Sequence, residues 1–244
     1  MGASELIPSA LILSTRTPHH LRFVDALSTS YKVTVIYEVS PEPAQGPNRL
    51  DLEEASGEVE LAHWKKPHEA IDLQCEGVSY VDNINCEEAK EVIVNSKPDI
   101  AFSFGTRKID IDTLHLLPEQ SLNFHGGNTE RYRGLDSILW ALYHKDLTGM
   151  MVTLHWLSED LDRGDISMRC KLPLDELGSL ATLRSKVTEK CIFLAHLAMH
   201  SWANYQWLPN SSPESVGRYY SQIPDDLIPG CREGLALLRI SASD

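Results

Sequence analysis

The sequence predicts an α/β protein built on an open, mostly parallel, twisted sheet with helices on both faces. Residues 10–14 form a short apolar run that ends in a polar residue, as expected of a buried parallel strand, and residues 32–37 form a second apolar strand. Between them Leu21, Val24 and Leu27 recur at helical spacing. This alternation of strand, helix and strand is typical of a parallel sheet.

The remaining elements follow in order along the chain. Pro18 lies near the start of the first helix. Residues 40–57 are rich in Pro, Glu and Gly and are expected to form a surface loop. We expect further helices over 86–95, 111–117, 138–143 and 180–202, and strands over 100–104, 121–125 and 151–156. After Trp207 the composition changes to Ser, Pro and Asp, so we divide the chain into a main domain over 1–206 and a short C-terminal extension over 207–244.

Composition excludes several classes of partner. The net charge of −13, from 22 basic and 35 acidic residues, argues against a protein that binds nucleic acid. The five cysteines are odd in number and include no C-x-x-C pair, so neither a zinc site nor a disulfide framework is predicted. No apolar run reaches membrane-spanning length, and the N-terminus lacks the features of a signal peptide. We expect a soluble, cytoplasmic protein without a membrane partner.

The most informative motif is Asn123-Phe124-His125, at the end of a predicted strand. Residues two apart on a strand point to the same side, so the Asn123 carboxamide and the His125 imidazole should face one cleft. Gly126 and Gly127 then release the chain from the sheet. An amide donor beside an imidazole is suited to a carbonyl that becomes a tetrahedral oxyanion. Taken alone, the asparagine reads as a turn former and the histidine as a loop residue.

A carboxylate could return to the same cleft from residues 159–165. This segment carries four acidic residues, and its composition alone does not choose among Glu159, Asp160, Asp162 and Asp165. The same acids also fit a solvated acidic loop. Gly164 stands where a tight loop would need a conformationally permissive residue.

Three motifs in order resemble the formyltransferases that use 10-formyltetrahydrofolate, a family that includes the glycinamide ribonucleotide, methionyl-tRNA and sugar-nucleotide N-formyltransferases. The motifs are Pro98–Ile109; Asn123-Phe124-His125 with Tyr132-Arg133-Gly134; and Thr153-Leu154-His155 with Leu161-Asp162-Arg163-Gly164. They span somewhat over a quarter of the chain. The resemblance implies a Rossmann-like formyltransferase core, which makes residues 1–206 the catalytic domain, and it is strongest to the sugar-nucleotide enzymes.

The resemblance also implies roles for individual residues. It selects Asp162 from the acidic loop to shuttle a proton and orient His125, with Asn123 and His125 at the formyl carbonyl. His155 matches the family as a supporting residue. The residues implied for the co-substrate 10-formyltetrahydrofolate are Phe104, Arg107, Lys108, Ile109, Leu157 and Asp160. The residues expected at the acceptor are Arg16, His19, Tyr132 and Arg133; the first two follow the first strand, at the sheet edge where such folds bind ligands.

The expected activity is formyl transfer to the amine of a small acceptor, most consistently an amino sugar carried on a nucleotide. With 244 residues, we do not expect the basic C-terminal domain of the methionyl-tRNA enzymes, and the loop after the first strand does not show the Gly-rich phosphate loop of the glycinamide ribonucleotide enzymes. The turn at residues 126–131 also lacks the family's usual proline, which leaves the acceptor open. Alternatives are hydrolysis of 10-formyltetrahydrofolate and a catalytically idle folate- or nucleotide-binding protein. Metal binding by His125, His155 and Asp162 is disfavoured, because a role in polarising a carbonyl needs no metal; a homodimer is left open.

Overall fold

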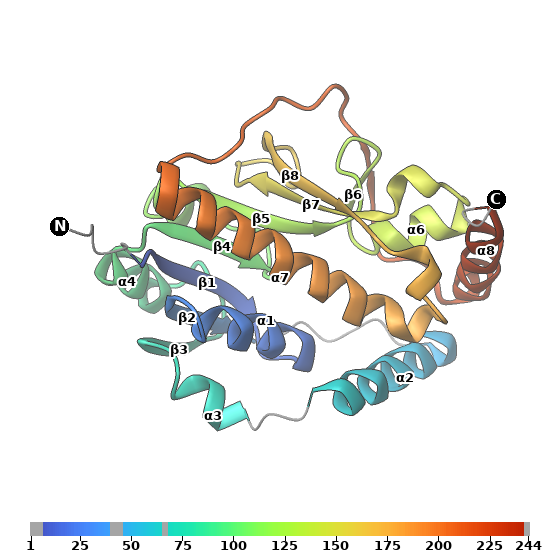
Figure 1. The fold of residues 1–244 in the computed structure, drawn as a ribbon, viewed down its shortest axis with the longest axis horizontal. Helices are drawn as coiled ribbons and strands as arrows, with labels where there is room; N and C mark the ends of the chain where they lie inside the picture. The colour runs from blue at the N-terminus through green and yellow to red at the C-terminus, as the bar shows by residue number, and fades with distance from the viewer. Residues whose placement is uncertain (1–6, 40–45, 65–67, 242–244) are drawn as a thin grey trace.

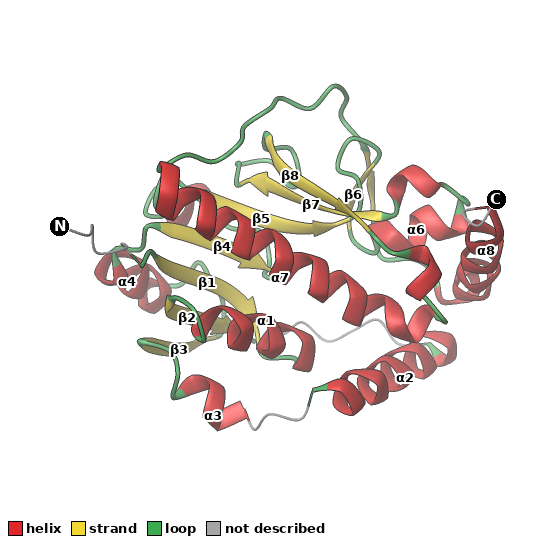
Figure 2. Cartoon of the chain, viewed as in Figure 1, coloured by secondary structure: helices red, strands yellow, loops and turns green. Residues whose placement is uncertain are grey.

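The computed structural model describes residues 7–39, 46–64 and 68–241. Seven strands form one sheet in the order β3-β2-β1-β4-β5-β7-β8. This order can be followed from one edge of the sheet, at β3, to the other, at β8, in Figures 1 and 2. The strands are β1 Ser9–Thr15, β2 Lys32–Glu38, β3 Gly77–Val81, β4 Ile100–Phe104, β5 Ser121–Gly126, β7 Met151–Trp156 and β8 Ile166–Lys171. The first five are parallel to one another; β7 pairs antiparallel with β5, and β8 pairs antiparallel with β7. The predicted open, mostly parallel sheet is confirmed.

Helices cover both faces of the sheet because its central strands are apolar on both sides. In β1, Ala10 and Ile12 enter one hydrophobic core, and Leu11 and Leu13 enter the other. The first core is covered by α1 and α7, which lie across the front of the sheet in Figure 1, and the second by α4. The helices are α1 Pro18–Ser28, α2 Pro47–His63, α3 His68–Asp72, α4 Glu87–Ser96, α5 Ile111–Leu114, α6 Ser137–Tyr143, α7 Leu180–Tyr205 and α8 Ile228–Ser241.

The loop expected over 40–57 is wrong from residue 47 onward, where α2 begins; residues 40–45 lie outside the described part of the chain. Helix α2 buries the polar residues Arg49, Ser56 and Glu60 beside Leu52, so it has no apolar stripe that a sequence pattern could reveal. The first turn of α2 is also capped by a residue that is distant in the sequence. The Asp225 carboxylate accepts hydrogen bonds from the backbone N–H groups of Asn48 and Arg49.

Helix α5 ends at Leu114, earlier than the predicted Leu117. The next residues form tight turns, in which the N–H of Leu116 bonds to the Thr113 carbonyl and that of Leu117 to the Leu114 carbonyl. Pro118 follows, and a residue that precedes proline is disfavoured in the α conformation. The other helices expected from the sequence are confirmed within a few residues of their ends.

The segment after residue 206 packs on the same core as the rest of the chain. Strand β9 (Arg218–Tyr220) pairs in parallel with β6 (Tyr132–Gly134), and α8 buries Cys231, Leu235 and Leu238 in the core that contains α6 and α7. Helix α8 was not anticipated from the sequence; the division at residue 206 stays a proposal. Among the described residues, no helix has the length and apolar character needed to cross a membrane.

Candidate active site

Asn123 and His125 lie on one face of β5, as their spacing predicts. The intervening Phe124 enters the core on the opposite face, with α7. Strand β7 pairs with β5 so that Asn123 stands opposite His155, and the Asn123 Nδ2 lies 3.1 Å from the His155 Nε2. The other His155 nitrogen lies 2.9 Å from the Trp156 carbonyl, which can only accept. His155 Nε2 therefore accepts from Asn123 and fixes the direction of its carboxamide.

His125 is held at both ring nitrogens. It is 6% exposed, and its Nε2 donates to the Tyr132 carbonyl over 2.9 Å. Its Nδ1 lies 3.3 Å from the Asp162 Oδ1. Because a carbonyl and a carboxylate both accept hydrogen bonds, this arrangement favours a ring that donates from both nitrogens.

Asp162 closes the cluster from the loop between β7 and β8. Its backbone is left-handed, with φ of 53°, an uncommon conformation that aspartate tolerates better than most residues. The carboxylate accepts from the Gly134 N–H over 2.8 Å and lies 3.5 Å from the His155 Nε2. Burial alone would raise its pKa. His125 and the Gly134 N–H outweigh burial and hold the pKa of Asp162 well below its usual range.

A cavity of about 180 Å³ opens beside this cluster, between the loops that follow β4 and β7. We call it the loop-side cavity. Asn123, His125, His155 and Asp162 all line it. Five of the six residues predicted for the folate line it as well: Arg107, Lys108, Ile109, Leu157 and Asp160. The sixth, Phe104, lines the neighbouring cavity.

That second cavity, of about 340 Å³, is lined largely by α2, α6 and α7, and we call it the helix-side cavity. It contains His19, which was predicted at the acceptor. The two cavities share Gly105, Phe124, His125, Gly134 and Leu135. His125 therefore stands at the junction of two spaces, each of which could hold one reactant.

Three residues predicted at the acceptor lie outside both cavities. Arg16 pairs with Asp72 at 2.8 Å and lies over the Tyr80 ring. Tyr132 is buried, and its hydroxyl donates to the Asp146 carboxylate. The guanidinium of Arg133 donates to the carbonyls of Gly217 and Leu161. Each of these side chains contacts other parts of the protein, and Arg133 ties the loop that carries Asp162 to residue 217.

The helix-side cavity contains residues that the sequence did not single out. Arg49 and Glu53 come from α2, Asp136 from the turn before α6, and Arg184 from α7. Each is an isolated charged residue in a polar segment, and no spacing marks it. Within the described residues, no group of three His, Cys, Asp or Glu side chains is arranged to hold a metal ion.

Gly164→Ala should destabilise the loop that presents Asp162. A Cβ at this position would lie 1.7 Å from the Trp156 carbonyl oxygen, so the backbone must move. We expect a loss of about 1–3 kcal/mol in the free energy of unfolding, measured by chemical denaturation. Gly57→Ala is the matched control: nothing lies within 4 Å of its Cβ position in α2. It should stabilise the protein by about 0.5–1 kcal/mol. Equal effects at the two positions would contradict the close approach at Gly164.

The chain matches the formyl transferase family over residues 15–194, and it belongs to that family. The bifunctional polymyxin resistance protein ArnA of Wigglesworthia glossinidia brevipalpis is 30% identical over 118 residues, which cover 48% of this chain and 18% of that protein. This chain spans less than half the length of the relatives that it matches in sequence.

Solved structures share the fold. A sugar N-formyltransferase from Shewanella superposes with a TM-score of 0.57 at 16% identity, covering 88% of this chain and 77% of that one. The formyltransferase PseJ from Anoxybacillus kamchatkensis, solved with UDP-4,6-dideoxy-4-formamido-L-AltNAc and tetrahydrofolate, has a TM-score of 0.51 at 18% identity, covering 87% and 85%.

Proposed function

We propose that this protein transfers the formyl group of 10-formyltetrahydrofolate to the amine of a small acceptor. The observation that carries the proposal is the position of His125 at the junction of the two cavities. The folate would occupy the loop-side cavity, with its formyl group at His125. The acceptor amine would approach from the helix-side cavity. Membership of the formyl transferase family supports this chemistry.

The cluster can stabilise the tetrahedral intermediate of this reaction. Asn123 Nδ2 has two N–H groups; one bonds to His155, and the other is available to the formyl oxygen. His125 adds a second donor if its Nε2–H turns from the Tyr132 carbonyl to the developing oxyanion. The acceptor nitrogen then forms the new C–N bond, the bond to the folate nitrogen breaks, and the proton lost by the amine is returned to that nitrogen.

For the acceptor we propose an amino sugar carried on a nucleotide. Support comes from the solved structures that share the fold: several are sugar N-formyltransferases, and PseJ was solved with a UDP-linked formamido sugar. Release of tetrahydrofolate, measured with a panel of nucleotide-linked amino sugars as acceptors, tests this choice. Turnover with amines of other classes and none with this panel would contradict it.

Tetrahydrofolate should bind in the loop-side cavity. The pterin ring offers several donors and acceptors that backbone groups of the two loops can meet. A crystal soaked with tetrahydrofolate is expected to show the ligand between residues 104–109 and 157–162, with its reactive nitrogen toward His125. Binding elsewhere, or no binding at millimolar tetrahydrofolate, would count against the proposed function itself.

A further inference from the structure

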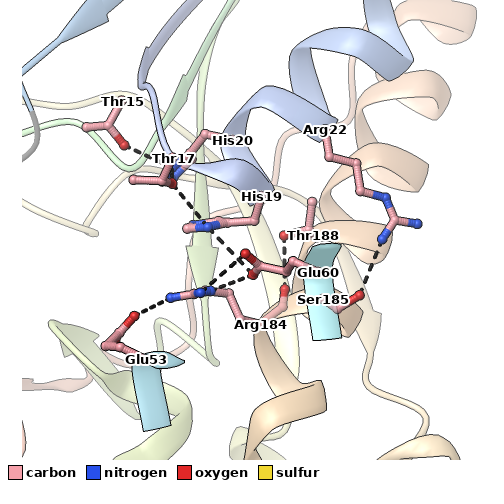
Figure 3. A network of polar contacts seen from close by, with 10 residues as sticks. All are labelled: Thr15, Thr17, His19, His20, Arg22, Glu53, Glu60, Arg184, Ser185 and Thr188. Atoms are coloured by element: carbon pink, nitrogen blue, oxygen red, sulfur yellow. Dashed lines mark hydrogen bonds and ion pairs between the residues drawn. The ribbon is translucent and has the colours of Figure 1, made fainter. Parts of the chain in front are cut away.

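The arginines that line the helix-side cavity are already paired with carboxylates. Arg49 contacts Asp136 through a short ion pair, and its side chain is 7% exposed. Arg184 binds Glu60 with two nitrogens, at 2.6 and 3.2 Å, and a third nitrogen contacts Glu53. Figure 3 shows the Arg184 guanidinium between the two glutamates. Among the described residues of this cavity, neither guanidinium is left free to grip a phosphate in the usual two-pronged way.

His19 adds no positive charge to the cavity. It stacks on His20 with ring centroids 3.9 Å apart, and its Nδ1 lies 3.1 Å from the Thr17 hydroxyl. Burial, with further contributions from His20 and Arg184, lowers the pKa of His19 well below its usual value. A neutral His19 close to Glu60 (3.8 Å, Figure 3) adds no positive charge that would attract an acceptor phosphate.

The two arginines that line this cavity are offset by carboxylates. Arg49 is paired with Asp136, and Arg184 is paired with Glu53, which also lines the cavity, and with Glu60, which does not. The glutamates differ in access: the Glu60 side chain is 4% exposed, and that of Glu53 is 37% exposed. Glu60 anchors Arg184 from behind, and Glu53 is the carboxylate that a ligand can reach.

The remaining walls suit the C–H faces of a small ring. They are formed by apolar side chains: Leu52, Phe104, Ile138, Leu139, Leu183 and Val187. The volume of about 340 Å³ lies at the lower end of the range for small-molecule sites. A cavity with apolar walls and a few hydrogen-bonding groups at one end matches a molecule that is partly apolar and rich in hydroxyl groups.

We propose that the helix-side cavity receives the sugar ring of an amino sugar and no phosphate, and that Glu53 determines this specificity by accepting a hydrogen bond from a hydroxyl group of the ring. The proposal rests on the proposed function and deepens it. Any phosphate of a nucleotide carrier lies outside the cavity. A phosphate inside would lie close to the carboxylates of Glu53 and Asp136 and would have to break the Arg184–Glu53 pair to find a guanidinium donor.

Glu53→Gln tests the proposal, with Glu54→Gln, an exposed neighbour on α2, as the matched control. The probes are glucosamine and glucosamine 6-phosphate, whose binding is measured by calorimetry without folate. Wild-type protein should bind glucosamine at least about tenfold more tightly than its phosphate. Glu53→Gln should narrow that ratio by about tenfold, because it removes a charge and frees an Arg184 N–H. Arg184 stays anchored by Glu60, so the fold is retained.

A wild-type preference for the phosphate, no binding of either probe at millimolar concentration, or an unchanged ratio in Glu53→Gln would each overturn the proposal. An equal change in Glu54→Gln would also overturn it, because the effect would then be a general one of surface charge. Tetrahydrofolate binding, measured on the same samples, distinguishes failure of the proposed function from failure of the proposed role of Glu53. Its absence would contradict the proposed function, whereas a preference for phosphate with intact folate binding contradicts only the role of Glu53.

Discussion

Asn123→Ala and His125→Ala should each lower formyl transfer by roughly two to three orders of magnitude, the usual effect of removing an oxyanion donor. The carboxamide of Asn123 is aimed by His155, and the His125 ring is fixed between Tyr132 and Asp162. Turnover is measured as release of tetrahydrofolate in the presence of a competent amine.

The matched controls are Asn95→Ala and His115→Ala, exposed residues that line neither cavity. They should leave turnover unchanged. Because His125 is buried and makes two polar contacts, its variant is also compared with wild type by thermal unfolding, and the rates are taken per folded molecule. Near-normal turnover in both Asn123→Ala and His125→Ala would end the catalytic assignment.

The parts of the site that follow a strand could be predicted from sequence. The period of two along β5 placed Asn123 and His125 on one face, because strand geometry leaves no other arrangement. The loop residues 107–109 and 157–160 were located by family resemblance, and they line the cavity beside these side chains. Local spacing determines the first arrangement, whereas the second was available only from the family resemblance.

The wall formed by α2 could not be predicted in this way. Its helix is capped by Asp225, far away in sequence, and it buries Arg49 and Glu60 in ion pairs with Asp136 and Arg184. A buried face made of paired charges has the composition of a surface loop. Only tertiary contacts distinguish the two, and a single sequence does not contain them.

Asp162→Asn should lower turnover steeply and leave tetrahydrofolate affinity nearly unchanged. Asparagine also tolerates the left-handed backbone found at this position, so the loop keeps its shape while the negative charge facing His125 is lost. Glu159→Gln is the matched control in the same loop, because Glu159 is exposed and lines neither cavity. Asp160→Asn should also lower turnover little, because the Asp160 side chain is 64% exposed and pairs with Arg163.

The depressed pKa of Asp162 refines its role. A carboxylate held this strongly in the ionised form is a weak base, which favours orientation of His125 over storage of the amine's proton. The acid limb of the wild-type pH–rate profile should then report another group. Asp162→Asn should lower the whole profile without moving that limb; a limb that disappears in the variant would instead assign the proton shuttle to Asp162.

The same shift predicts a pH-dependent difference in stability. Because the folded-state pKa of Asp162 is lowered, its ionisation stabilises the fold at pH values above the unfolded pKa of about 3.9, and this contribution is lost as pH falls further toward the folded-state pKa. The gap in unfolding free energy between wild type and Asp162→Asn should therefore shrink between neutral pH and about pH 3. A gap in unfolding free energy that is constant with pH would mean that the Asp162 carboxylate is not held by His125. In the separate turnover measurement, equal losses at Asp160 and Asp162 would mean that the catalytic carboxylate has been placed at the wrong residue.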